Sequence, residues 1–238
     1  MKIKYVTLTG ADDSIDPADL IPLTKQYPFV EWAILFSQSK LGVERYPSLD
    51  WVDELVEEVA PNRQINLSAH LCGKWCEDAL KGEITFLREG TYDKAFNRVQ
   101  LNMGKDRLQL AVKSKPLIDA TMRVRQPVIF GGNYKYVSVS GRFFEDTSLF
   151  PLFDASGGRG VETKEWPKPF LGSDGAPIFC GYAGGLGPDN VAAELERIAD
   201  VAGDMTIWID METKLRTGEK FDLEKCERVL QVTRPWVG

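Results

Sequence analysis

The sequence has one histidine and four cysteines in 238 residues, and these low counts exclude several classes of site. A structural zinc site needs four ligands, and Cys72 and Cys76 have no second cysteine pair to complete one. Cys180 and Cys226 lie in apolar stretches and are expected in the core. Four cysteines in a chain of this length do not make the dense disulfide framework of small secreted domains. We therefore expect no metal, no cofactor and a reducing, cytoplasmic location.

Long apolar runs and an excess of basic charge are also missing. The longest runs, such as Trp32–Phe36 and Pro127–Phe130, are too short to span a bilayer. Residues Met1–Lys4 do not begin a secretory signal. The 29 Lys and Arg residues are scattered and are outnumbered by 35 Asp and Glu, for a net charge of -6. Nucleic acid and anionic membranes are therefore not expected as partners, whereas a local positive pocket for a small anion remains open.

What the sequence does have is a regular alternation of short apolar runs and amphipathic stretches. The runs contain β-branched or aromatic residues, as is typical of strands buried on both faces of a parallel sheet. They cover residues 3–8, 32–36, 65–69, 98–101, 127–130, 150–153, 178–181 and 206–209. Eight strands with helices between them predict a single α/β domain over residues 1–238, folded as a parallel eight-stranded (β/α)8 TIM barrel.

Three of the intervening helices have clear sequence signals. Residues 48–59 have Ser48 as N-cap and Pro61 as a stop, residues 188–202 begin with Pro188, and residues 222–232 have apolar residues at helical spacing. Residues 131–148 have no helical period, so a β excursion or a long loop is predicted there.

The first candidate for chemistry is Asp154, which directly follows the apolar run 150–153. An acid at the carboxyl end of a barrel strand lies on the face where barrel enzymes catalyse. The loop 157–160 that follows is Gly-Gly-Arg-Gly, and its glycines allow backbone N–H groups to approach a ligand closely. The alternative is a flexible surface turn.

The second candidate is the glycine-rich stretch 184–190, which follows the seventh predicted strand and opens a helix. Exposed N–H groups and the helix dipole favour a phosphate there, and Pro188 suits the first helical turn. Glycine-rich loops are common in such folds, but phosphate sites of barrels are often built after the seventh and eighth strands.

These motifs together resemble phosphoribosylanthranilate isomerase, a (β/α)8 enzyme of tryptophan biosynthesis. The family's sixth-strand pattern resembles Leu152-Phe153-Asp154, Gly157 to Gly160 and Trp166, and its seventh-strand pattern is matched by Gly184-Gly185-Leu186-Gly187-Pro188-Asp189-Asn190-Val191. Weaker matches are Ser39-Lys40 with Arg45-Tyr46, and Val99-Gln100-Leu101. The resemblance covers most of the chain and fades between residues 104 and 148.

The resemblance implies an aldose–ketose isomerase acting on a phosphorylated sugar derivative. Asp154 would be the general acid that protonates the ring oxygen of a phosphoribosylamine. Arg45 would hold the substrate carboxylate, and the backbone around Gly158, Gly184 and Gly185, with Arg159 beside it, would bind the phosphate.

Two positions depart from the family. Val6 stands where the family's first strand has a cysteine that acts as general base, and valine cannot accept a proton. In the eighth-strand motif Lys214 replaces the phosphate-binding glycine, and Glu212 adds a negative charge. Lys214 and Arg216 could bind the anion by charge instead.

Two further residues could supply the missing base. His70 ends the third predicted strand and is either a replacement base or a structural histidine. Asp210 ends the eighth and is either a second acid–base carboxylate or the partner of a nearby lysine.

Three functions follow from these alternatives. The preferred one is an isomerase-like barrel, monomeric or homodimeric, with a small phosphorylated molecule as its partner. The second is a relative that kept ligand binding and lost catalysis with its cysteine. The weakest is a barrel similar to ribulose-phosphate epimerase, whose paired Asp and His metal ligands one histidine cannot supply.

Overall fold

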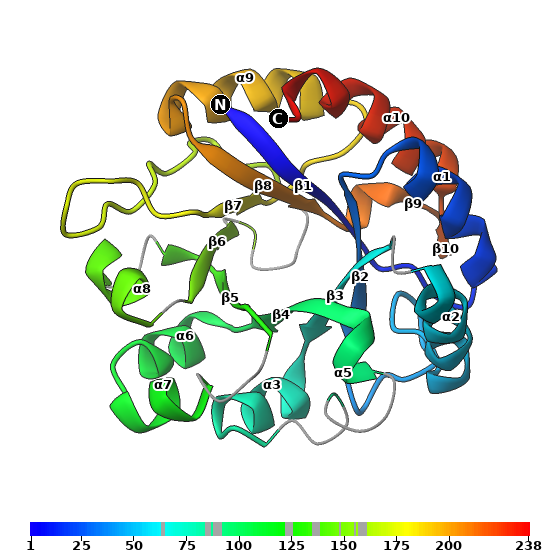
Figure 1. The fold of residues 1–238 in the computed structure, drawn as a ribbon, viewed down its shortest axis with the longest axis horizontal. Coiled ribbons are helices and arrows are strands. Elements are labelled where there is room, and N and C mark those ends of the chain that lie inside the picture. The colour runs from blue at the N-terminus through cyan, green and yellow to red at the C-terminus, as the bar shows by residue number, and fades with distance from the viewer. Residues whose placement is uncertain are drawn as a thin grey trace.

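A computed structural model describes residues 1–62, 65–83, 87, 92–121, 126–134, 139–147, 149–154, 156 and 161–238. Eight parallel strands close into a barrel in chain order, with β8 bonded to β1 (Figure 1). The strands are β1 Lys2–Thr9, β2 Val30–Phe36, β3 Asn66–Leu71, β4 Phe96–Asn102, β5 Val128–Gly132, β6 Phe150–Asp154, β7 Gly181–Ala183 and β8 Thr206–Met211. The predicted (β/α)8 fold is confirmed.

Helices surround the barrel and cover its outer face (Figure 1). They are α1 Leu20–Gln26, α2 Leu49–Asn62, α3 Gly73–Leu80, α5 Tyr92–Ala95, α6 Lys105–Ala111, α7 Lys115–Thr121, α8 Gly141–Thr147, α9 Val191–Ala202 and α10 Leu223–Thr233. Short 3-10 turns are η1 Pro17–Asp19, η3 Thr213–Leu215 and η4 Arg234–Trp236, and β9 Arg216–Thr217 pairs with β10 Lys220–Phe221. None of these helices is long and apolar enough to cross a membrane.

Three sequence predictions differ from the observed elements. The seventh strand is β7 Gly181–Ala183 and shares only Gly181 with the predicted 178–181, because residues 178–180 lead into the barrel without pairing as a strand. Residues 131–148 include helix α8, whose seven residues are too few to show a period. Helix α2 continues past Pro61 to Asn62, although a proline stop was predicted before that point.

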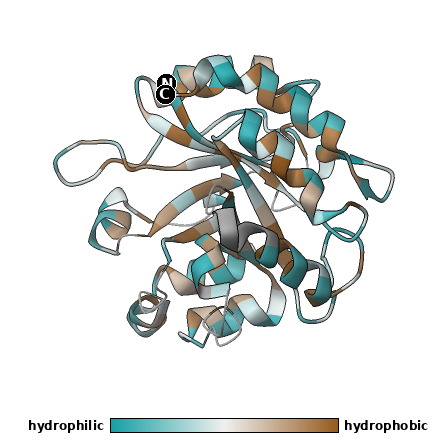
Figure 2. Ribbon diagram, turned by 45° about the vertical axis from the view of Figure 1, so that its right-hand side comes forward, coloured by the Kyte–Doolittle hydropathy of each residue, from teal (hydrophilic) through white to brown (hydrophobic). Residues whose placement is uncertain are grey.

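Apolar side chains pack in two places, one inside the barrel and one between the barrel and the helices. The strands and the helix faces turned towards them are mostly hydrophobic, while outward faces are hydrophilic (Figure 2). The larger cluster includes Val6, Leu8 and Ile34, and the smaller one consists of Ile129, Leu152, Ala183 and Trp208 inside the barrel. Side chains alternate along each strand, so the inward positions form a set separate from this outer core.

The inward positions hold a buried ion pair below the site. Arg98 on β4 donates to both carboxylate oxygens of Glu31 on β2, at 2.7 and 2.5 Å, and Thr7 donates to Glu31 at 2.9 Å. The Arg98 guanidinium also lies 4.8 Å from the Tyr5 ring centre and 4.7 Å from that of Trp208. This pair fixes strands β1, β2, β4 and β8 to one another beneath the cavity.

The connection from β6 to β7 differs from the others. Its described residues, 156 and 161–180, contain no helix. Aromatic side chains cover this side instead: Phe170 packs on Phe144 at 5.2 Å and on Phe153 at 5.3 Å, and Trp166 packs edge-on against Tyr182 at 5.7 Å. The segment thereby shields the outer face of β6 and β7 without a helix.

Candidate functional site

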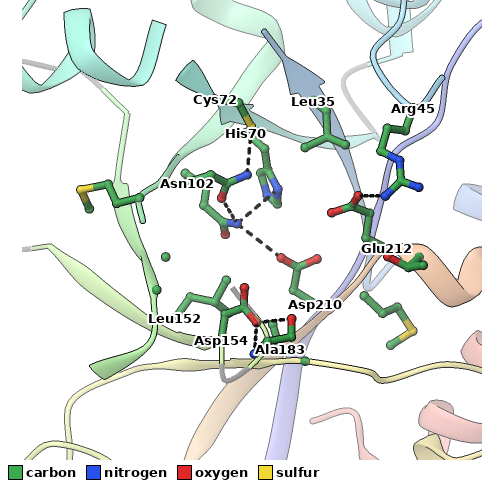
Figure 3. Close-up of a pocket in the computed structure, with 18 of the residues that line it drawn as sticks. Leu35, Arg45, His70, Cys72, Asn102, Leu152, Asp154, Ala183, Asp210 and Glu212 are labelled. Atoms are coloured by element: carbon green, nitrogen blue, oxygen red, sulfur yellow. Dashed lines mark hydrogen bonds and ion pairs between the residues drawn. The ribbon is translucent and has the colours of Figure 1, made fainter. Parts of the chain in front are cut away.

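A cavity of about 950 Å³ opens at the carboxyl ends of the strands (Figure 3). Side chains from β2, β3, β4, β6 and β8 line it, together with the loops that follow β2, β4 and β7. Its size is sufficient for a phosphorylated sugar derivative. The described candidate residues from the sequence all line it, apart from Arg216: Arg45, His70, Asp154, Gly184, Gly185, Asp210 and Lys214.

Asp210 is the buried carboxylate of this cavity. It lies near the end of β8 and points across the barrel towards Gln100 (Figure 3). Its Oδ1 accepts from Thr9 Oγ1 at 2.6 Å and its Oδ2 from Gln100 Nε2 at 3.4 Å. Burial raises the pKa of Asp210 to about 7, and the nearby charges of Glu212 and Asp154 act in the same direction. A carboxyl group with this pKa both accepts and donates a proton at neutral pH.

Asp154 ends β6, which β7 separates from β8, and its side chain faces Asp210 in Figure 3. Its Oδ1 accepts from the backbone N and from Oγ of Ser156, at 2.9 and 2.7 Å. These two bonds hold the carboxylate in one rotamer at the cavity edge, where it is half-buried. Asp154 thus lines the cavity at the carboxyl ends of the strands, the face on which the sequence places it.

A third carboxylate, Glu212, is paired with Arg45. Arg45 Nη1 lies 2.7 Å from Glu212 Oε1, and Nη2 lies 2.9 Å from Glu44 Oε1. Burial raises the pKa of Glu212, and the hydrogen bond and charge of Arg45 oppose this shift. Arg45 adopts φ +63°, which is uncommon for a residue with a side chain, and its N–H donates to Asp12. Arg45 thus lines the cavity already paired with Glu212. A substrate carboxylate would have to compete with Glu212 for the guanidinium group.

His70 and its neighbours form the wall opposite the carboxylates. His70 is 1% exposed, and burial, aided by the charge of Arg98, lowers its pKa to about 3. It is therefore neutral and a very weak base, which argues against the replacement base suggested by the sequence. Gln100 Nε2 lies 3.3 Å from His70 Nδ1 and 2.9 Å from Asn102 Oδ1, and Asn102 Nδ2 lies 3.4 Å from Cys72 Sγ.

The loop after β7 forms the wall predicted to bind phosphate. Gly184 and Gly185 have φ +121° and +69°, and a Cβ on Gly185 would lie 2.6 Å from the backbone N of Glu162. Asn190 fixes the loop, because its Oδ1 accepts from Gly187 N and its Nδ2 donates to Gly185 O, both at 2.9 Å. Only glycine fits these backbone positions without strain or collision.

Lys214 lies against the same loop. A Cβ on Gly187 would fall 2.5 Å from the Cβ of Lys214, and Lys214 Nζ lies 2.5 Å from Glu162 Oε1. Lys214 is therefore beside the glycines, and its ammonium group is paired with a carboxylate. Arg216 is not part of this wall: it is buried and bonded to Asp12 at 2.8 Å and to Gly10 O at 2.9 Å.

Two other predictions concern the loop after β6 and the first strand. Gly158 and Arg159 lie outside the described residues. Val6 is fully buried in the outer core, whereas Thr7 and Thr9 on the same strand face the barrel interior. The residue of β1 beside the carboxylates is therefore Thr9, so a cysteine at Val6 would not reach the cavity. Strand alternation decides this, because neighbouring residues of a strand point to opposite faces of the sheet.

Sequence reasoning gave no role to Gln100 and Asn102 in this wall. A signal was present: β4 reads Arg98, Gln100, Asn102 at every second position. Polar residues at period two in a strand buried on both faces mark the side that faces the barrel interior. Tyr46, Lys40 and Cys72 also line the cavity, but they lie in loops where no periodicity marks them.

Cationic groups lie at the rim of the cavity. Lys40 Nζ is 5.0 Å from the centre of the Tyr46 ring, and Lys105 begins α6. Among the described residues, no group of three or more His, Cys, Asp or Glu side chains is arranged to hold a metal ion. The site thus combines the buried carboxylate of Asp210 and the half-buried one of Asp154 with exposed cations.

Comparisons with known proteins match this fold and not a family. No protein-family model and no curated protein matches the sequence. Among solved structures, N-(5'-phosphoribosyl)anthranilate isomerase from Pyrococcus furiosus is similar with a TM-score of 0.52 and 11% identity, over 97% of this chain and 98% of that one. A variant of NCR from Zymomonas mobilis has a TM-score of 0.50 and 17% identity, over 100% of this chain and 91% of that one.

Phospho-2-dehydro-3-deoxyheptonate aldolase from Thermotoga maritima is also similar, with a TM-score of 0.50 and 12% identity, over 97% of this chain and 68% of that one. At such identities these likenesses establish the TIM-barrel fold alone. One fold of this kind hosts many unrelated reactions, so function has to be argued from the site.

Proposed function

We propose that this protein is an isomerase-type enzyme that binds a small phosphorylated sugar derivative in the barrel mouth and moves a proton between carboxylates and substrate. Asp154 is the acid and Asp210 the base. The motif resemblance to phosphoribosylanthranilate isomerase supports this substrate class. Val6, at the position of that family's cysteine base, does not face the cavity. We therefore propose a similar reaction on a related substrate and not that family's own reaction.

The pairing of Asp210 with Asp154 is the observation that carries the proposal. Both line one cavity, from β6 and β8 on either side of β7, and burial raises the pKa of Asp210 to about 7. Enzymes separate the roles of two carboxyl groups by giving them different environments. Asp154 is half-buried and oriented by Ser156, whereas Asp210 is almost fully enclosed.

The resemblance assigns the acid step to Asp154, which leaves the base step to Asp210. Asp154 delivers a proton to the ring oxygen and opens the sugar. Asp210, in its ionised form, takes the proton from the carbon next to the C=N or C=O carbon of the open-chain sugar. The C–H electron pair forms a carbon–carbon double bond while the C=N or C=O pair moves onto nitrogen or oxygen. The resulting enaminol or enediol then loses its hydroxyl proton to form the new carbonyl and gains a proton on the neighbouring carbon. One carbon is oxidised as its neighbour is reduced, so no outside oxidant is needed.

The phosphate is assigned to the loop after β7. Gly184 and Gly185 bring backbone close to the cavity, and Lys214 adds a positive charge beside them. Lys214 exchanges Glu162 for the phosphate when ligand binds. A phosphate held there places the sugar across the cavity towards Asp154 and Asp210.

The second candidate is a binding protein without catalysis. The observation that favours it is the fixed position of Asp210, which Thr9 and Gln100 hold as they would a structural carboxylate. Arg45 is likewise already paired, so part of the cavity wall is satisfied without a ligand. In this alternative the glycine loop binds a phosphorylated ligand and no proton moves.

Proton exchange separates the two functions. Ribose 5-phosphate is incubated with the protein in D₂O, and deuterium at the carbon beside the carbonyl is followed by NMR, with binding measured by calorimetry. The enzyme incorporates deuterium, and Asp210→Asn and Asp154→Asn each lower the rate about 10²–10⁴-fold with affinity changed little. The exposed Asp204→Asn is the matched control and retains the rate.

The other outcomes of this experiment either assign the protein to the second function or refute both. Binding without exchange by the unaltered protein assigns it to the non-catalytic class. Absence of binding to ribose 5-phosphate, together with absence of binding to inorganic phosphate, refutes both functions.

A further inference from the structure

His70 lies in the wall of the cavity and has no part in the acid–base assignment. Its ring extends from β3 towards the middle of the cavity, in the direction of Asp210 (Figure 3). It is 1% exposed, and Nε2 has no hydrogen-bond partner among the described residues. Buried polar atoms are nearly always paired, so such an atom in a cavity wall indicates a group that arrives with the ligand.

The network around Gln100 decides which ring nitrogen bears the proton. Gln100 Nε2 carries two hydrogens and has three acceptors near it, Asn102 Oδ1 at 2.9 Å, His70 Nδ1 at 3.3 Å and Asp210 Oδ2 at 3.4 Å, so the two longer contacts share one hydrogen. If the amide were turned over, its oxygen would face the oxygens of Asn102 and Asp210. The amino group therefore points at Nδ1, Nδ1 is the acceptor, and the single proton of the neutral ring is on Nε2.

We propose that His70 is a neutral hydrogen-bond donor, through Nε2–H, to the substrate oxygen that gains negative charge during the proton transfer. The substrate class is thereby narrowed to α-hydroxy carbonyl phosphates, or their amino counterparts. Gln100 Oε1 is the other buried atom of this wall without a hydrogen-bond partner among the described residues, and it accepts from the hydroxyl beside the carbonyl. A donor next to an acceptor matches a carbonyl next to a hydroxyl.

This role rests on the proposed function and completes its step. As Asp210 removes the proton from the carbon beside the carbonyl, the C–H pair forms the carbon–carbon double bond and the carbonyl pair moves onto oxygen. The Nε2–H of His70 stabilises that oxygen. A neutral imidazole does this without transferring its own proton, and a charged one would be costly so close to Arg98.

The single histidine makes the test direct, because a ¹⁵N-histidine-labelled protein has one imidazole to observe. Proton–nitrogen correlation spectra of the free protein between pH 5 and 9 are expected to show a neutral ring protonated at Nε2 throughout. A ring protonated at Nδ1, or one that becomes charged in this range, overturns the proposal. On addition of ribose 5-phosphate the Nε2–H signal shifts, and on addition of inorganic phosphate, which has no carbonyl, it does not.

Two variants separate a donor from a structural ring. His70→Gln places an amide N–H near the former Nε2, and His70→Asn keeps only the atom near Nδ1 that meets Gln100. Affinity for ribose 5-phosphate falls about tenfold more in His70→Asn than in His70→Gln, the size expected for one buried hydrogen bond. Thermal melting of both variants verifies folding, and equal losses of affinity in the two folded variants overturn the proposal.

The proposed function and this inference fail differently. Binding of ribose 5-phosphate with no movement of the His70 signal refutes the role of His70 alone. Absence of ribose 5-phosphate binding refutes the donor role of His70, and absence of inorganic phosphate binding as well refutes the proposed function. The ring tautomer of the free protein retains or loses its support separately.

Discussion

Asp210→Asn tests the electrostatics of the cavity without any ligand. In the unfolded chain an aspartate has a pKa near its ordinary value of 3.8, and in the folded protein burial raises it to about 7. Between these values the folded state binds one proton that the unfolded state lacks. The stability from this group is therefore complete below the unfolded pKa and is lost as the pH rises through the folded pKa of about 7.

The size of the effect follows from the two pKa values. The rise from 3.8 to about 7 corresponds to about 4 kcal/mol, at about 1.4 kcal/mol for each pH unit. The unaltered protein thus loses up to about 4 kcal/mol of unfolding free energy from Asp210 between about pH 4 and pH 8. The asparagine of the variant does not titrate, so the stability of the variant relative to the unaltered protein rises by that amount over the range. Loss of the hydrogen bonds to Thr9 or Gln100 changes the unfolding free energy of the variant by the same amount at every pH. It therefore leaves the dependence of that free energy on pH unaffected.

Urea unfolding at half-unit pH steps measures this difference. The exposed Asp204→Asn provides the control and should follow the unaltered protein at every pH. Parallel curves for Asp210→Asn and the unaltered protein over the whole range would show that the Asp210 carboxyl is not desolvated. The assignment of Asp210 as a base active near neutrality would then lose its support.

Three more predictions concern the loop after β7, the buried ion pair and the substrate. Gly185→Ala should abolish binding of ribose 5-phosphate, because its Cβ would strike the adjacent backbone at 2.6 Å; Gly203→Ala has φ +59° with open space, and calorimetry should find its binding unchanged. Glu31→Gln leaves Arg98 buried without its counter-charge and should lower the free energy of unfolding by about 3–5 kcal/mol in urea melts; a loss under about 1 kcal/mol would contradict this. Phosphoribosylanthranilate should be turned over poorly or not at all, about 10²–10⁴-fold below a barrel with the cysteine base, and ordinary turnover in a fluorescence assay would refute this.

The sequence determined the fold and the end of the barrel at which the candidate site lies. Short apolar runs alternating with amphipathic stretches admit few architectures, and a parallel barrel puts all strand ends on one face. Asp154, His70 and Asp210 each directly follow a predicted strand, so their approach to one cavity followed from topology. The glycine-rich loop after the seventh strand was also recognisable, because the positive φ of Gly184 and Gly185 is a local requirement.

Tertiary structure alone decided the pairings and the protonation states. Arg45 and Glu212 are far apart in the sequence, and only closure of the barrel between β8 and β1 brings them within 2.7 Å. The inward direction of Thr9 instead of Val6 depends on strand register, and a shift of one residue reverses the face. The neutral state of His70 and the raised pKa of Asp210 arise from desolvation, a property of the enclosed space that no single segment of the chain contains.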